Sequence, residues 1–222
     1  MMTVAVIVDF KTKSKPIAGI RTVIVDNTTD NRGFAAGVNI GIKKALAMGA
    51  KKVLLVNPDL KIGDKRNIRE IGYIGDIGGP VLWFRRNGKD VFDFGGKVNW
   101  FLGRTYHVEA GSSNQESGEI EYVSGACMVV DRKVFEKIGF FDERFFMYFE
   151  DVDFCLRAKQ AGFKVAVNPK IIVEHQIEEH RHFDNPLKKK YLLDSNRKFV
   201  EKWISPMFIP LTAIYLALLS RK

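Results

Sequence analysis

Residues 51–59 read KKVLLVNPD, in which the apolar run Val53 to Val56 stops at Asn57-Pro58-Asp59. Such a short apolar, β-branched run predicts a strand that is buried on both faces, as in a parallel sheet. Asp59 would then stand as a rigid carboxylate at the carboxyl end of that strand, where α/β proteins bind ligands. Asn-Pro is also a common turn dipeptide, so a purely structural turn remains open from these residues alone.

The preceding residues repeat the pattern of an apolar strand that ends in an aspartate. Residues 4–8 (VAVIV) precede Asp9, and residues 22–25 (TVIV) precede Asp26. Between the second strand and residue 51, apolar residues at helical spacing over 38–49 predict a helix, which completes a βαβ unit. We therefore expect Asp9, Asp26 and Asp59 to converge, although any one of them could simply cap a loop.

After residue 59 the pattern is less regular. The glycine-rich stretch 72–103 predicts only short strands and loops. Residues 121–130 predict a strand interrupted by Gly125, and a short helix follows from Asp131 to Gly139. An aromatic loop leads to a helix over 150–161, then to strands at 163–167 and 171–173, the second ending in Glu174-His175.

The helix at residue 150 opens with Glu150-Asp151-Val152-Asp153, three carboxylates in four residues. Acidic side chains near a helix N-terminus are stabilised by the helix dipole, so a structural role is open. One acid suffices for that role, however. The other carboxylates could accept a proton from a hydroxyl or hold a substrate.

Composition limits the class of protein. The 222 residues include 46% hydrophobic and 27% charged side chains, as in one globular chain with a substantial core. The net charge of +9 suggests an anionic partner, but residues 1–180 carry only +3 and residues 181–222 carry +6. The two cysteines form no disulfide framework or metal spacing, and residues 1–8 predict a strand in place of a leader peptide. A reducing, cytoplasmic location is expected.

The C-terminal residues 203–219 (WISPMFIPLTAIYLALL) form an uncharged run next to basic residues. A membrane-spanning helix needs about 20 apolar residues, and this run is shorter and holds two prolines. Trp203 and Tyr215 with flanking cations suit a peripheral position at a membrane surface. A helix docked on its own domain is the alternative.

Four blocks of this sequence, taken together, resemble the inverting glycosyltransferases of family two, particularly the rhamnosyltransferase-like branch. They are VDNTTD at 25–30, NRGFAAGVNIG at 31–41, LLVNPD at 54–59, and the stretch from Ser124-Gly125 through GFFDE at 139–143 to FEDVDFCLR at 149–157. The resemblance spans about residues 4 to 200, and the blocks are specific only as a set.

The resemblance implies site residues position by position. Asp26 would hold the nucleotide's base or ribose, and Asp59 would be the last residue of a DxD-like metal motif in which Asn57 replaces the first aspartate. Asp151 would be the general base and His175 a further ligand of Mg²⁺ or Mn²⁺. By the same matching, Asn39 and Asn57 would help bind the nucleotide. The residues that would bind the sugar or the acceptor are Ser124, Gly125, Glu150, Asp153 and Arg157.

The implied fold is the α/β GT-A fold, with a mostly parallel central sheet flanked by helices. Only residues 10–21 separate the first two strands, so the first helix is expected to be shortened or absent. We expect a catalytic domain over residues 1–185 and a basic, apolar helical extension over 186–222.

The implied function is transfer of a sugar, rhamnose among the candidates, from a nucleotide-diphosphate donor to a glycan or lipid-linked acceptor. Two alternatives stay open. One is a degenerate protein that binds nucleotide sugars without turnover. The other is a nucleotidyltransferase, which should carry a loop rich in glycine and basic residues near the first strand, where residues 9–21 contain three lysines but only one glycine. Nucleic acid is not an expected partner, because the basic tail contains no recognisable binding module.

Overall fold

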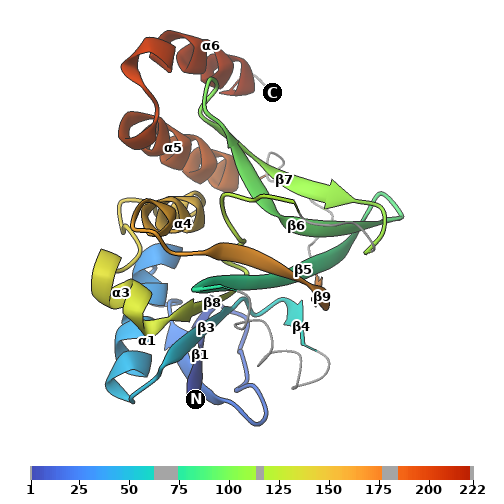
Figure 1. The fold of residues 1–222 in the computed structure, drawn as a ribbon, viewed down its shortest axis with the longest axis vertical. Helices are drawn as coiled ribbons and strands as arrows, with labels where there is room; N and C mark the ends of the chain where they lie inside the picture. The colour runs from blue at the N-terminus through green and yellow to red at the C-terminus, as the bar shows by residue number, and fades with distance from the viewer. Residues whose placement is uncertain (1, 63–74, 114–117, 177–184, 221–222) are drawn as a thin grey trace.

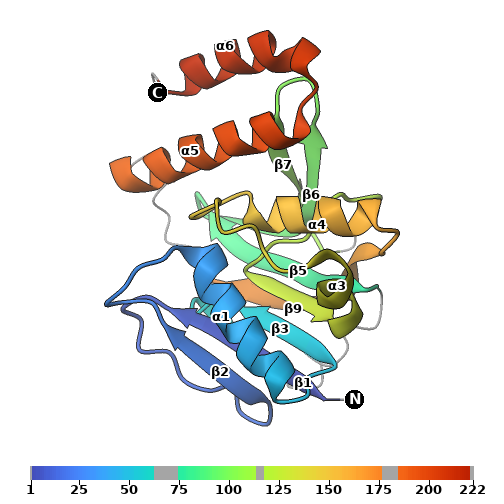
Figure 2. The same cartoon turned by 90° about the vertical axis from the view of Figure 1, so that its left-hand side faces the viewer.

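The computed structural model describes residues 2–62, 75–113, 118–176 and 185–220. One sheet runs through the molecule, with α1, α3 and α4 on one side of it and α5 and α6 stacked beyond α4 (Figures 1 and 2). The strands are β1 Thr3–Asp9, β2 Arg21–Asp26, β3 Lys52–Val56, β4 Leu60–Lys61, β5 Ile77–Arg86, β6 Lys89–Asn99, β7 Arg104–Ala110, β8 Cys127–Asp131 and β9 Val165–His175. The helices are α1 Phe34–Ala47, α3 Arg132–Ile138, α4 Glu150–Gln160, α5 Pro186–Trp203, the 3₁₀ turn η1 Pro206–Phe208 and α6 Ile209–Ser220.

The sheet is mixed, which corrects the expectation of a mostly parallel one. Its strand order is β2-β1-β3-β8-β5-β6-β7, and β9 pairs with β4 and β5. Only the β1–β2, β1–β3 and β5–β9 pairs are parallel. The other pairs are antiparallel because β5, β6 and β7 follow one another as hairpins, and β8 inserts between β3 and β5 in the opposite direction.

The glycine-rich middle contains long strands, so the expectation of short strands and loops was wrong. β5 has 10 residues and β6 has 11. Asn87 and Gly88 join them with φ values of 52° and 73°. Two positive φ values in succession are the requirement of a tight hairpin turn, and Asn-Gly is the sequence that meets it best.

The predicted helices at 131–139 and 150–161 are confirmed as α3 and α4. Asp131 precedes α3, and Gly139 ends it at a φ of 77°, where a side chain would be strained. The predicted strands at 163–167 and 171–173 are instead one strand, β9. The connection from β1 to β2 makes turns and contains no helix.

Helix α5 shares the main core of the molecule. Phe199 is fully buried there, and its ring lies 5.1 Å from that of Phe149, just before α4. The Ser195 hydroxyl donates a hydrogen bond to the carbonyl of Met147 at 2.8 Å. The contacts of α5 therefore fix the loop that leads into α4.

Candidate active site

The strands β2, β1 and β3 are neighbours, so their carboxyl ends lie along one edge of the sheet. Asp9 and Asp26 are paired in register at the last positions of β1 and β2. The Asp9 carboxylate accepts hydrogen bonds from the backbone N–H groups of Thr12 and Ser14, both at 2.8 Å, and so shapes the following turn. Asp26 is exposed, and one of its oxygens accepts the Thr28 N–H at 2.8 Å. Of these two carboxylates, Asp26 is the one open to a ligand.

The Asn57-Pro58-Asp59 turn places Asp59 against the end of β9. The Gln176 N–H donates to the Asp59 carbonyl at 2.9 Å, and β4 pairs with β9 through Leu60 and His175. As a result, His175 Nε2 lies 3.3 Å from Asp59 Oδ2. The Asp59 side chain is 48% exposed and that of His175 is 14% exposed. Two residues that lie 116 positions apart in the sequence thus form one pair, with the carboxylate facing solvent.

This pair fits a divalent cation of the Mg²⁺ or Mn²⁺ kind. A carboxylate oxygen suits either ion, and the imidazole nitrogen beside it can serve as a second ligand. Within the described parts of the chain, no group of three or more His, Cys, Asp or Glu side chains could hold a metal. With two protein ligands, Asp59 and His175, a bound ion would keep coordination positions for oxygens of another molecule.

A hydrogen-bonded path connects this turn to the start of α4. The Asn57 N–H donates to the Ala126 carbonyl at 2.8 Å, and the Ser124 hydroxyl accepts the Ala126 N–H at 3.2 Å. The Gly125 N–H, between them in the chain, donates to Asp151 Oδ2 at 2.8 Å. Ser124 and Gly125 therefore lie between the Asp59–His175 pair and Asp151.

The backbone just before α4 adopts an unusual conformation. Tyr148 and Phe149 have φ values of 72° and 67°, in the left-handed region that bulky residues rarely occupy. The loop is held from the other side by Phe34, whose N–H donates to the Phe146 carbonyl at 2.7 Å. Gly33 packs so closely there that a Cβ atom would lie 2.4 Å from the Phe146 carbonyl oxygen. Such locally strained backbone is typical of functional sites.

Asp151 is half-buried and held by backbone donors. Its carboxylate accepts N–H hydrogen bonds from Gly125 and Val152, both at 2.8 Å. Burial raises the pKa of Asp151 above its ordinary value, while these two hydrogen bonds and the charge of His107 oppose that rise. A fixed carboxylate with a raised pKa is suited to accept a proton.

Glu150, the preceding residue, is only 6% exposed, and its Oε2 atom has no hydrogen-bond partner among the described residues. Burial, together with the neighbouring Asp151, raises the pKa of Glu150 well above its ordinary value. Two adjacent carboxylates in a buried site do not both ionise readily. Glu150 has the stronger rise in pKa and an Oε2 atom without a donor among the described residues, so the neutral form is favoured more strongly in Glu150 than in Asp151.

A histidine that the sequence analysis missed lies within electrostatic reach of Asp151. His107, on β7, has its Nδ1 atom 2.8 Å from Oδ2 of the buried Asp93 on β6. The other Asp93 oxygen accepts the Gly95 N–H at 2.9 Å, which fixes the carboxylate. The imidazole packs edge-on against Tyr122 with a centroid distance of 5.6 Å and remains 41% exposed. Burial disfavours the charged imidazole, but the hydrogen bond and charge of Asp93 outweigh it, and the pKa of His107 is raised.

Three sequence-predicted site residues are engaged elsewhere in the protein. Asp153 is fully buried and accepts hydrogen bonds from Arg157 Nε at 2.9 Å and Trp203 Nε1 at 2.8 Å. Arg157 also donates to the carbonyls of Ile138 and Phe140. Asn39 is buried on α1 and bonds to both backbone polar groups of Phe141. These side chains join helices and loops, and their polar atoms are taken up by those partners.

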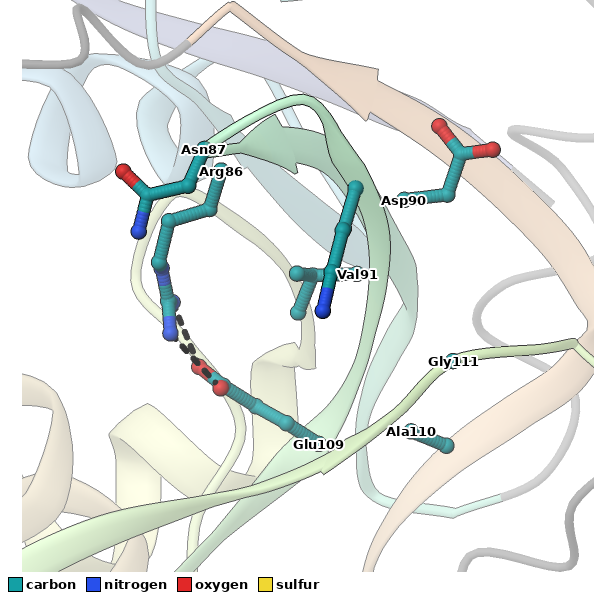
Figure 3. Close-up of a pocket in the computed structure, with 8 residues that line it drawn as sticks. Arg86, Asn87, Asp90, Val91, Glu109, Ala110 and Gly111 are labelled. Atoms are coloured by element: carbon teal, nitrogen blue, oxygen red, sulfur yellow. Dashed lines mark hydrogen bonds and ion pairs between the residues drawn. The ribbon is translucent and has the colours of Figure 1, made fainter.

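A surface hollow of the described residues lies elsewhere (Figure 3). It measures about 390 Å³ and is lined by the β5–β6 turn and the end of β7, with Arg86 and Glu109 joined by two hydrogen bonds of 2.9 and 2.8 Å. It contains none of the residues predicted from the sequence. The chemistry of Asp59, His175 and Asp151 is therefore the better guide to the site.

The sequence also matches a known protein family. Residues 4–191 match the family model described as "Glycosyltransferase like family 2". The chain is 31% identical over 144 residues to the low-salt glycan biosynthesis hexosyltransferase Agl10 of Haloferax volcanii, covering 61% of this chain and 46% of that protein. It is 29% identical over 173 residues to the dTDP-rhamnosyl transferase RfbF of Shigella flexneri, covering 76% of this chain and 57% of that protein. The chain spans about half the length of the curated relatives it matches.

Two solved structures share the fold. GalNAc-T7 with UDP, GalNAc and Mn²⁺ superimposes with a TM-score of 0.59 at 12% identity, covering 91% of this chain and 48% of that one. The mannosyltransferase PcManGT from Pyrobaculum calidifontis, in complex with GDP-Man and Mn²⁺, gives 0.52 at 10% identity, covering 98% of this chain and 69% of that one. At such low identity these likenesses establish the fold alone, which is the GT-A glycosyltransferase fold.

Proposed function

The chain belongs to glycosyltransferase-like family 2, and from that premise we propose that it transfers a sugar from a nucleotide-diphosphate donor to an acceptor hydroxyl, with inversion at the anomeric carbon. The observation that carries the proposal is the path from Asp59–His175 through Asn57, Ala126 and Gly125 to Asp151. A site for a diphosphate and a site for a base are thereby held at a fixed relation to each other.

On the donor side, Asp59 and His175 would hold Mg²⁺ or Mn²⁺, and Asp26 would contact the nucleoside. When bound, such an ion offsets the negative charge that develops on a departing nucleoside diphosphate. Asn57 is half-buried just after β3, and its backbone N–H is held by the Ala126 carbonyl. Its side chain would then contact the donor in the same region. Metal use and this division of residues are parts of the proposal.

On the acceptor side, Asp151 accepts the proton of the attacking hydroxyl. The Gly125 and Val152 N–H groups fix the direction of its carboxylate. Glu150, whose pKa is raised by burial, would add no second negative charge when it holds a proton. A positioned general base contributes about 10² to 10⁴ in rate. His107, fixed by Asp93, supplies a positive charge that favours the ionised form of Asp151.

For the transferred sugar we propose a hexose or a deoxyhexose of the rhamnose type. The support is that the relatives are described as a hexosyltransferase and as rhamnosyltransferases, including WbbL of Escherichia coli at 25% identity. The acceptor would be a glycan or lipid-linked hydroxyl. A protein that binds nucleotide sugars without turnover is the competing function, because the connection from β1 to β2 contains no helix.

A donor panel tests the proposal. UDP-, GDP- and dTDP-sugars are added singly to the protein with Mn²⁺, with Mg²⁺ or with EDTA, and the thermal midpoint is recorded. A ligand at 100 times its Kd stabilises by about 2.7 kcal/mol, or ~5–10 °C for a chain of this size. One donor class should shift the midpoint, and only with metal. Release of nucleoside diphosphate from that donor supports the transferase, whereas binding without any release supports the binding protein, and no shift from any donor contradicts both.

A further inference from the structure

Helix α6 exposes apolar side chains and turns a polar one inward. Thr212 is fully buried and its hydroxyl donates to the Phe208 carbonyl at 2.7 Å. Ile214 and Leu218 are 61% and 57% exposed, and Met207 in the preceding turn is 74% exposed. A surface helix of a water-soluble domain shows the opposite order. We call this surface the α6 face; its exposed members are Met207, Ile209, Leu211, Ile214 and Leu218.

The α6 face is rigidly attached to the fold. The β6–β7 turn inserts between α5 and α6, where Gly103 lies so close to Val200 and Thr212 that a Cβ atom would come within 2.7 Å of each. Asn196 Nδ2 donates to the Gly103 carbonyl at 2.9 Å. From the same turn Phe101, 60% exposed, contacts the Phe208 ring at 4.9 Å. Figures 1 and 2 show the hairpin reaching the two C-terminal helices.

The α6 face is too short to cross a bilayer. None of the helices in the described residues is long and apolar enough to do so. At 12 residues, α6 is about 18 Å long, against a hydrocarbon core of about 30 Å. A helix of this length can lie parallel to a membrane, with one side in the boundary between headgroups and acyl chains.

Charge decides which occupant fits the α6 face. Residues 186–222 contain eight Lys or Arg and two Asp or Glu, a net charge of +6. Lys190 and Arg197 on α5 are exposed, and the Arg104 guanidinium lies 5.9 Å from the Tyr215 ring beside the α6 face. A second copy of the chain would bring two such positive surfaces together, which is unfavourable. An anionic bilayer attracts them, by about 1 kcal/mol for each cation near its surface.

We propose that the α6 face docks this protein on an anionic lipid surface, with α6 lying flat in the interface and the cations of α5 against the headgroups. Docking of this kind needs neither donor nor acceptor, so it can be tested independently of the sugar transfer. If both hold, the docked chain would work on acceptors held at that surface.

The test is flotation of the 222-residue chain with vesicles. Vesicles of phosphatidylcholine with 30% phosphatidylglycerol should bind the chain, and pure phosphatidylcholine should bind it much less. Ile214→Glu should weaken binding at least tenfold, since burial of an isoleucine side chain contributes about 1.5–3 kcal/mol. Met48→Glu is the matched control, because Met48 is a 42% exposed apolar residue at the far end of α1. It should bind as the unaltered chain does.

A second variant, Lys188→Gln/Lys189→Gln/Lys190→Gln, should lose binding to anionic vesicles only. Thermal melts confirm that each variant folds. Equal flotation of the unaltered chain and Ile214→Glu, or no binding to either kind of vesicle, overturns the proposal. If the chain does not bind vesicles but forms a dimer that Ile214→Glu dissociates, the α6 face is a contact between copies of the chain, and the proposal is also wrong.

Discussion

The first turn of α4 carries an aspartate on each of two faces, Asp151 and Asp153, and the two carboxylates have opposite surroundings. On the face toward β8, Asp151 is held by two backbone N–H groups and keeps an open side. On the face toward α5, Asp153 is fully buried and lies among Arg157, Lys202 and Trp203, at 2.7–2.9 Å. Only backbone amides hold the first carboxylate, whereas two cations and an indole N–H surround the second. The second carboxylate therefore joins helices, and the first is the better placed of the two to meet a ligand.

The difference arises from partners, because the helix position is nearly the same. Both residues lie in the first turn, where the helix dipole favours a negative charge. Backbone amides hold a carboxylate without neutralising it, whereas buried cations form ion pairs that define packing. Variants at these positions should therefore separate catalysis from stability.

Asp151→Asn should have the largest effect. Asparagine keeps nearly the shape of the side chain but cannot accept a proton at neutral pH, so transfer should fall by about 10² to 10⁴. Donor binding should change little, and the thermal midpoint should fall only modestly, because the amide keeps one of the two oxygens that accept backbone N–H groups. Release of nucleoside diphosphate in the presence of acceptor measures the first, and calorimetry with the donor measures the second. Near-normal turnover would remove Asp151 from the role of base.

Asp153→Asn should show the reverse, with a large loss of stability and little loss of activity per folded molecule. It leaves the largely buried Arg157 without its counter-charge, although Lys202 keeps Asp142 at 2.8 Å. Removing one partner of a buried ion pair costs about 3–5 kcal/mol. Urea unfolding of the variant should show this loss, with the remaining folded protein still active. Asp194→Asn is the control, since Asp194 meets Arg197 at 4.0 Å on an exposed side and should change stability by less than about 1 kcal/mol. An inactive but fully stable Asp153→Asn would contradict the assignment.

Asp59→Ala should weaken donor binding tenfold or more in Mn²⁺ and leave the weaker binding in EDTA unchanged. The reason is that Asp59 contributes the exposed carboxylate of the Asp59–His175 pair. Asp90→Ala, at the hollow of Figure 3, is the matched control and should change neither value. Calorimetry with and without metal makes the comparison. Unchanged metal-dependent affinity in Asp59→Ala would exclude Asp59 from the site.

His107→Gln should have a smaller effect, visible in the pH dependence. The charge of His107 lowers the pKa of Asp151 against the effect of burial, so its loss should raise that pKa. The acidic limb of kcat/KM, along which Asp151 becomes protonated, should move to higher pH, with a loss of less than about tenfold at pH 7. Asp93, Glu109 and Asp151 all face His107 and shape its own titration. An unchanged limb would limit His107 to a structural role.

The sequence indicates the parts of this site that depend on local order. The run before Asn57-Pro58-Asp59 predicts a strand end, and the acids at 150–153 predict a helix start; the structure has both. What it does not indicate is which acid meets which partner, because Asp153 pairs with residues about 50 positions away and Asp93 with a histidine on the next strand. His107 is a lone histidine in an alternating strand and carries no local signal. The Asn87-Gly88 turn, in contrast, is a hairpin signal that points to the long strands of the middle region.

Glu150→Gln should show the smallest effect, on stability alone, and it tests whether Glu150 holds the proton of the acidic pair. The pKa of Glu150 is raised in the folded state, so the folded protein binds this proton more tightly than the unfolded chain does. The resulting stabilisation is complete below the ordinary pKa of a glutamate and is lost as the pH rises through the raised value. Glutamine has no proton to lose, so the variant should lack this loss, and its stability relative to the unaltered chain should increase steadily from pH 4 to pH 8. Urea unfolding at several pH values measures the difference, and Glu201→Gln on the exposed side of α5 is the control. Parallel pH profiles for Glu150→Gln and the unaltered chain would mean that Glu150 is ionised in the folded protein, and Asp151 would then share its surroundings with a second negative charge.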